Sequence, residues 1–252
     1  TDIGLFTCDS DFGSDVSALF NVLTGFNSWV SGDMLDEETV AAMFHHIRIS
    51  PINVQQTFHK LIDREIEKSK PEKPGRIIAK MNALSDLKTI RKLYEASRAG
   101  VRIDLIVRGI CCLRPGINGL SENIRVISVL DRFLEHSRLY YFENGGDPQI
   151  YSGSADWMPR NFKKRVEIIY PIKSPELKAR IYNEILLTTL NDNVKARIMK
   201  ADGSYTRVKQ KETEKPLRSQ FEFINIARKA GIKSPPYEEC FKKNNPKKRS
   251  KR

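Results

Sequence analysis

The sequence predicts an α/β fold with a mixed, largely parallel sheet flanked by helices. Three observations support this. An amphipathic helical pattern begins at residue 54, a strand-helix-strand alternation spans residues 76–107, and several short apolar segments follow it. The chain has 252 residues, which is enough for one or two domains with a sizeable core.

The helical pattern leads into a βαβ unit. Val54, Phe58, Leu61 and Ile62 recur at helical spacing with polar residues between them, which predicts an amphipathic helix. The proline-rich loop "SKPEKPG" separates this helix from a buried strand, "RIIAKMN". A second helix and the strand "VRIDLIV" complete the unit. Such units form parallel sheets, so we expect a ligand at the carboxyl ends of these strands.

The segments after this unit predict that the sheet becomes mixed. "IRVISVL", "RLYYFEN", "QIYSGS" and "RVEIIYPI" are strand-like, and the chain between them is too short for a helix at each connection. Ser174, Pro175 and Glu176 predict a helix start, because serine caps, proline suits the first position and an early acid is favourable. "ADGSY" predicts a hairpin turn.

The sequence divides into three expected units. Residues 1–47, with the strand-like opening "IGLFTC", are expected to be the end of a preceding catalytic domain plus a linker. Residues 48–215 are expected to form the main catalytic domain. Residues 216–252 are rich in lysine and arginine and are expected to be a basic, flexible tail.

Charge and composition favour a polyanionic partner. The chain has 43 Lys+Arg against 31 Asp+Glu, a formal net charge of +12. No apolar run reaches the length of a bilayer span and no signal-peptide pattern is present, so we expect a cytoplasmic protein, with peripheral membrane association left open. The four cysteines lack metal-ligand spacing, and we expect no metal site within the chain.

The stretch "HSRLYYFENGGDPQIYSGSADW", residues 136–157, predicts a phosphoryl-transfer site. Strand alternation places His136 and Arg138 on one face. An imidazole can act as nucleophile or general acid, and a guanidinium binds pairs of phosphate oxygens. Glu143 can orient the imidazole, and the "SGSAD" turn can bring Ser154 to the same anion. The alternative is a histidine packed against the aromatic residues of the strand.

Other cations are candidates for the same site. Arg108 ends a parallel strand, so phosphate contact is expected there. Lys80 and Asn82 end the preceding parallel strand, although helix capping is an alternative for Asn82. Arg114 is open between phosphate binding and loop structure, and Arg160 between a polyanion channel and a solvated charge.

The stretch also has the form of a known half-site. It reads H-x-R-x4-E followed by G-S-x-D and is similar to the H-x-K-x4-D and G-S-x-N half-site of the phospholipase D superfamily, with Arg138, Glu143 and Asp156 as the departures. "RIIAKMNALSD", "LYEASRAGVRIDLIVRGICCLRPGI", "GLSENIRVISVLDRFLEHSRLYYFENGG" and "YSGSADWMPRNFKKRVEIIYPI" together resemble the carboxy-terminal catalytic region of bacterial polyphosphate kinases of the long-chain type. The resemblance covers Thr1 to about Lys209 and is densest from Arg76 to Ile172.

This resemblance implies a phospholipase D-like fold and a function. It implies reversible transfer of the γ-phosphoryl group of ATP to inorganic polyphosphate through a phosphohistidine. His136 would be a second active-site histidine that assists transfer, and Arg108 would contact the nucleotide phosphates. The phosphorylated histidine and the Mg²⁺ ligands of the family are expected upstream of Thr1, so the isolated chain is expected to be an inactive fragment. ATP, ADP and polyphosphate are the expected ligands, nucleic acid is not expected, and a homo-oligomer is expected for the full-length protein.

Two other functions are left open by the residues. One is a phospholipase D-superfamily phosphodiesterase or nuclease whose site is completed by dimerisation. The other is a non-catalytic polyanion-binding module that uses only the basic surface.

Overall fold

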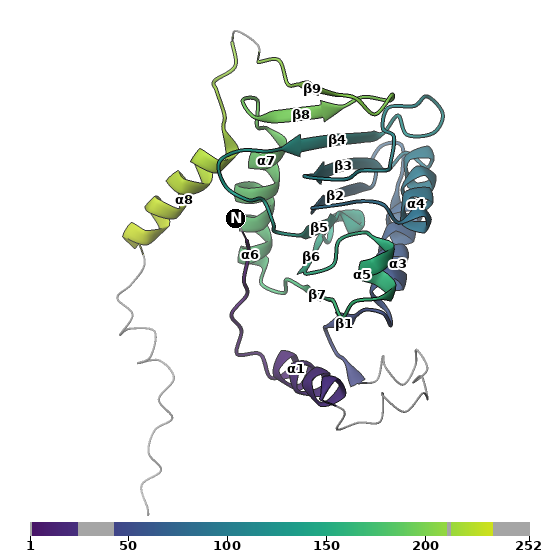
Figure 1. The fold of residues 1–252 in the computed structure, drawn as a ribbon, viewed down its shortest axis with the longest axis vertical. Coiled ribbons are helices and arrows are strands. Elements are labelled where there is room, and N and C mark those ends of the chain that lie inside the picture. The colour runs from purple at the N-terminus through teal and green to yellow at the C-terminus, as the bar shows by residue number, and fades with distance from the viewer. Residues whose placement is uncertain (1, 25–42, 211–212, 234–252) are drawn as a thin grey trace, which may run out of the picture.

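A computed structural model describes residues 2–24, 43–210 and 213–233 of the chain (Figure 1). The helices are α1 (Ser10–Leu23), α3 (Val54–Lys68), α4 (Leu87–Arg98), the 3-10 turn η2 (Asn144–Gly146), α5 (Pro159–Lys163), α6 (Pro175–Arg180), the π-helical η3 (Ile181–Leu187), α7 (Thr188–Leu190) and α8 (Ser219–Lys233). The strands are β1 (Arg48–Ile49), β2 (Arg76–Met81), β3 (Arg102–Val107), β4 (Ile124–Val129), β5 (Leu139–Phe142), β6 (Gln149–Gly153), β7 (Ile168–Pro171), β8 (Ala196–Met199) and β9 (Tyr205–Arg207).

The described strands form one mixed sheet, in the order β1-β7-β6-β5-β2-β3-β4-β8-β9. Only the ladders β2–β3 and β3–β4 are parallel, and the other ladders are antiparallel. The mixed α/β fold is therefore confirmed, but the expectation of a largely parallel sheet is wrong. The connection between β5 and β6, residues 143–148, is too short for the crossover that parallel neighbours need.

Helices cover both faces of the sheet (Figure 1). On one face α3 and α4 pack over a core that includes Phe58, Leu93 and Tyr140, all fully buried. On the other face η3 and α7 pack over a second core that includes Ile78 and Leu186. Alternate residues of each central strand face the two cores, which explains why these strands read as continuous apolar runs.

The predicted starts and turns have clear local causes. The hydroxyl of Ser174 accepts the N–H of Leu177 at 3.3 Å, which caps α6 as the sequence predicts. The carboxylate of Asp86 accepts the N–H of Thr89 at 2.9 Å and caps α4. β8 and β9 pair antiparallel across the predicted hairpin turn, where Gly203 has a φ of 88°.

The amino-terminal residues differ from the prediction. Residues 3–9 form no strand, although "IGLFTC" has a strand-like composition, because the segment pairs with no ladder partner. Phe12 and Leu19 of α1 pack with Ile47 and Ile49 beside Tyr170 of β7. The predicted domain boundary after residue 47 stays a prediction.

The carboxy-terminal prediction needs a correction. Within the range 216–252, residues 219–233 form α8, so this part is not a flexible tail. Arg218 anchors the start of α8, because its Nε and Nη2 donate to the two carboxylate oxygens of Asp131 at 2.7 and 2.6 Å. The basic residues of 234–252 lie outside the described residues. Among the described helices, none has the length and apolar character of a membrane span.

Candidate active site

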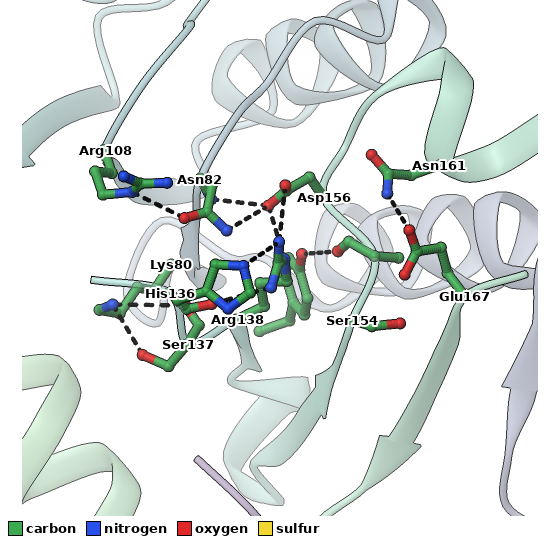
Figure 2. A network of polar contacts seen from close by, with 12 residues as sticks. Lys80, Asn82, Arg108, His136, Ser137, Arg138, Ser154, Asp156, Asn161 and Glu167 are labelled. Atoms are coloured by element: carbon green, nitrogen blue, oxygen red, sulfur yellow. Dashed lines mark hydrogen bonds and ion pairs between the residues drawn. The ribbon is translucent and has the colours of Figure 1, made fainter. Parts of the chain in front are cut away.

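The sheet topology brings four separate segments to one edge. β2 and β3 are parallel and end at this edge, whereas β5 runs antiparallel to β2 and therefore begins there. β6 runs antiparallel to β5, so the turn after it returns to the same edge. Figure 2 shows the resulting polar network, which contains Asn82 after β2, Arg108 after β3, His136 before β5 and Asp156 after β6.

His136 is held through both ring nitrogens. Its Nδ1 lies 3.0 Å from Asp2 Oδ2, and its Nε2 lies 3.4 Å from Nη2 of Arg138. The hydrogen bond with His136 is the main reason that the pKa of the Asp2 carboxyl group is lowered. The side chain of His136 is 44% exposed, so a ligand can reach it.

The predicted orienting role of Glu143 is wrong. Glu143 follows the other end of β5 and accepts a hydrogen bond from the Tyr141 hydroxyl. Asp2 is the carboxylate that contacts His136 instead. The sequence gives no signal for this contact, because the two residues are 134 positions apart.

The guanidinium of Arg138 is hydrogen-bonded to other residues of this chain. Its Nε and Nη2 donate to the two carboxylate oxygens of Asp156 at 3.0 and 3.2 Å, and its Nη1 donates to the His136 carbonyl at 3.0 Å. The side chains of Arg138 and Asp156 are only 12% and 7% exposed. Arg138 therefore fixes the backbone at His136 and the turn that carries Asp156, and its phosphate contact stays a prediction.

Asp156 joins this pair to Arg108 through Asn82. The N–H of Asn82 donates to Asp156 Oδ1 at 2.8 Å, and Asn82 Oδ1 accepts from Nε of Arg108 at 2.9 Å. Asn82 thus links two segments, and its alternative as a helix cap is wrong because Asp86 caps α4. Within the described part of the chain, neither terminal NH₂ group of Arg108 has a hydrogen-bond partner. Both groups are available to an anion.

Lys80 is buried beside this edge rather than open to it. It lies within β2 on the side of Ile78, is 3% exposed, and pairs with Glu135 Oε2 at 3.0 Å. Burial lowers the pKa of its ammonium group, and the charge of Glu135 opposes this. Because Glu135 and the Ser137 hydroxyl bind this ammonium inside the protein, the structure gives no support to the predicted phosphate contact of Lys80, which stays a prediction.

Three other candidates lie around the network. The Ser154 hydroxyl accepts the N–H of Ile168 at 3.2 Å, which holds it on the β7 side, and its phosphate contact stays a prediction. Arg114 is exposed, and its N–H donates to the hydroxyl of Tyr94 in α4 at 2.9 Å, so it lies beside α4 rather than in the network. Arg160 is exposed on α5.

The buried carboxylates of Asp156 and Glu135 near His136 do not fit a magnesium site. Asp156 is bound by Arg138, and Glu135 is bound by Lys80, so their oxygens already have cationic partners. Asp9 and His46 approach each other elsewhere with Asp11. There the ammonium of Lys173 lies 2.7 Å from Asp9 and 3.1 Å from the His46 ring, in the place a metal ion would take.

An exposed histidine and the two NH₂ groups of Arg108, which are unpartnered among the described residues, thus lie at one edge of an α/β domain, where the parallel strands end, and such groups are chemically suited to phosphoryl oxygens. Comparison with known proteins agrees with this class. Residues 47–220 match the family described as polyphosphate kinase C-terminal domain 2. The chain belongs to this family.

Individual relatives give the same result. The polyphosphate kinase of Halalkalibacterium halodurans is 51% identical over 227 residues, which cover 90% of this chain and 30% of that protein. Polyphosphate kinase 1 of Chlorobaculum tepidum is 49% identical over 209 residues, 83% of this chain and 28% of that protein. The crystal structure of the polyphosphate kinase from Porphyromonas gingivalis superimposes with a TM-score of 0.79 and 37% identity, covering 90% of this chain and 33% of that chain. The chain thus spans about a third of the length of these relatives.

Proposed function

We propose that this chain forms part of the active site of a polyphosphate kinase, which transfers the terminal phosphoryl group of ATP reversibly to inorganic polyphosphate. The proposal is supported by the membership of residues 47–220 in the family and by relatives named polyphosphate kinase at about half identity. One observation of this chain carries it. The free NH₂ groups of Arg108 and the exposed ring of His136 belong to one hydrogen-bonded network at a sheet edge.

The reaction has two displacement steps in this proposal. A histidine outside this chain attacks the γ-phosphorus, a P–N bond forms, the bond to the bridging oxygen breaks, and ADP leaves. The terminal phosphate oxygen of polyphosphate then attacks the phosphohistidine, so that a P–O bond replaces the P–N bond. Mg²⁺ accompanies the nucleotide in this proposal, and its protein ligands lie outside this chain.

His136 and Arg108 have different tasks. Asp2 accepts from Nδ1 of His136, which leaves the Nε2 atom, 3.4 Å from Nη2 of Arg138, as the one that can turn to a ligand. In the proposed complex Nε2 exchanges its contact with Nη2 of Arg138 for a hydrogen bond to an oxygen of the transferring group. Arg108 donates its two free NH₂ groups to neighbouring phosphate oxygens and neutralises the charge that moves during transfer.

The remaining site residues position these two. Asp156 and Arg138 fix the segments on either side of His136, and Asn82 orients the guanidinium of Arg108. The cytoplasmic location and the homo-oligomer of the longer protein are part of the same proposal.

The experiment is a reconstitution. The purified chain is mixed with the remaining part of the polyphosphate kinase from H. halodurans, and ADP formation from ATP and polyphosphate is measured. We expect ADP from the mixture, none from either part alone, and at least a hundredfold loss with His136→Ala. The Arg114→Ala variant is the matched control and should keep wild-type activity, because Arg114 lies outside the network. ADP formation or phosphodiester hydrolysis by the chain alone, or an active His136→Ala mixture, would contradict the proposal.

A further inference from the structure

Three buried polar side chains meet at the loop that carries His136. Lys80, Glu135 and Gln220 are 3%, 5% and 1% exposed. Glu135 receives the ammonium of Lys80 on Oε2 at 3.0 Å and the amide of Gln220 on Oε1 at 2.7 Å. This triad joins β2, the loop before β5 and the first turn of α8, which are far apart in sequence.

The triad determines the path of the loop that carries His136. Gln220 accepts the N–H of Phe133 and donates to its carbonyl, both at 2.8 Å. Lys80 donates to the Ser137 hydroxyl at 2.9 Å. Glu135 and Ser137 are therefore held inward on either side of His136, and the intervening side chain must point outward.

The start of α8 has a second attachment to the same region. Arg218 pairs with Asp131 through two hydrogen bonds, and the N–H and hydroxyl of Ser219 donate to Asp192 at 2.8 and 2.7 Å. A cavity of about 10 Å³ lies between Lys80, Glu135 and Arg108, so the triad also borders the other proposed phosphate-binding residue. Displacement of the triad would therefore affect both His136 and Arg108.

A buried ion pair contributes little net stability, because desolvation of both charges offsets their attraction. Apolar side chains of similar volume would fill the same space without lowering the free energy of unfolding. They would not, however, fix Glu135 and Ser137 by directional hydrogen bonds. The hydrogen bonds of the triad thus fix the position of the loop more than they stabilise the fold.

We propose that Lys80, Glu135 and Gln220 are positioning residues for His136, so that the first turn of α8 belongs to the active site. The consequence for phosphate binding rests on the proposed function above. None of the three touches the transferring group; they act by holding the loop 133–137 in one conformation.

The test compares Gln220→Met with Asn225→Leu in the 252-residue chain. Each variant replaces an amide by an apolar side chain of similar size on α8, but Asn225 is exposed, and the one hydrogen bond of its side chain within residues 2–24, 43–210 and 213–233 is with Glu222 at 3.3 Å. The first readout is the NMR signal of the His136 imidazole without ligand, assigned by its loss in His136→Ala. The second is the affinity for tripolyphosphate by calorimetry.

We expect Gln220→Met to shift or broaden the His136 signal and to weaken tripolyphosphate binding by about fivefold, because only a fraction of the molecules keeps the competent loop. Asn225→Leu should leave both unchanged. Ser137→Ala removes a single hydrogen bond to Lys80 and should act in the same direction with a smaller effect, which keeps the test available if Gln220→Met does not fold.

The outcomes separate the two proposals. Wild-type His136 signal and affinity in both Gln220→Met and Ser137→Ala would overturn the positioning role. A loss of melting temperature alone, with an unchanged His136 signal, would also overturn it, because that is what a purely structural role predicts. If Gln220→Met shifts the His136 signal but the wild-type chain does not bind tripolyphosphate, the positioning role would be supported and the proposed function would be contradicted.

Discussion

Replacing Asp156 by alanine should destabilise the fold and loosen the site together. Asp156 is 5% exposed and accepts the N–H of Asn82 at 2.8 Å and two donors of Arg138 at 3.0 and 3.2 Å. Asp156→Ala leaves the guanidinium of Arg138 without its counterion in a side chain that is 12% exposed. Breaking one partner of a buried pair costs about 3 kcal/mol or more, since the other charge stays desolvated.

The size of this effect can be checked against an exposed pair. For a domain of this length, about 3 kcal/mol corresponds to a fall in melting temperature of roughly 6–12 °C. Urea unfolding followed by circular dichroism gives the free energy directly. The control is Glu184→Ala, which removes an exposed i,i+4 pair with Arg180 at 3.3 Å and should cost less than about 0.5 kcal/mol. Equal and small losses for both variants would refute the role of Asp156 as the centre of the network.

Two further predictions concern Gly153, the last residue of β6, and the cysteines. Gly153→Ala should destabilise the chain by about 3 kcal/mol, because a Cβ there would clash with the carbonyl oxygen of Ile168. The control is Gly13→Ala, whose Cβ would meet nothing within 4 Å and which should be neutral or slightly stabilising. Equal unfolding curves for the two variants would contradict this prediction. Burial raises the pKa of the Cys111 thiol to about 11. At pH 8, iodoacetamide should therefore label the exposed Cys8 and Cys112 well before Cys111, as measured by peptide mass spectrometry. Equal labelling rates would argue against the burial of Cys111.

Much of the fold follows from local pattern and topology. The spacing of Val54, Phe58 and Leu61 predicts α3, and the capping residues at Ser174 predict α6, because these signals depend on neighbouring residues. The placement of Arg108 and His136 at one sheet edge also follows from the sequence. It needs only the order and direction of short strands, which the lengths of their connections restrict.

The missed features depend on long-range contacts. Asp2 contacts His136 across 134 positions, and no local pattern marks it. Lys80 reads as a strand-end cation, but its buried side chain pairs with Glu135, which in turn accepts from Gln220. The basic composition of residues 216–252 predicts a flexible tail and so gives no signal for the helix α8. Its apolar residues Phe223, Ile226 and Ala227 line a pocket that Ile3 and Ile185 also line.

The most direct measurement is tripolyphosphate affinity in four chains: wild type, Arg108→Ala, His136→Ala and Arg114→Ala. If Arg108 and His136 hold one anion, each of their variants should weaken binding by roughly tenfold or more, and Arg114→Ala should stay within about twofold of wild type. Equal, small losses in all three variants would show that the anion is held by diffuse positive charge, and the account of a shared site at this sheet edge would be wrong.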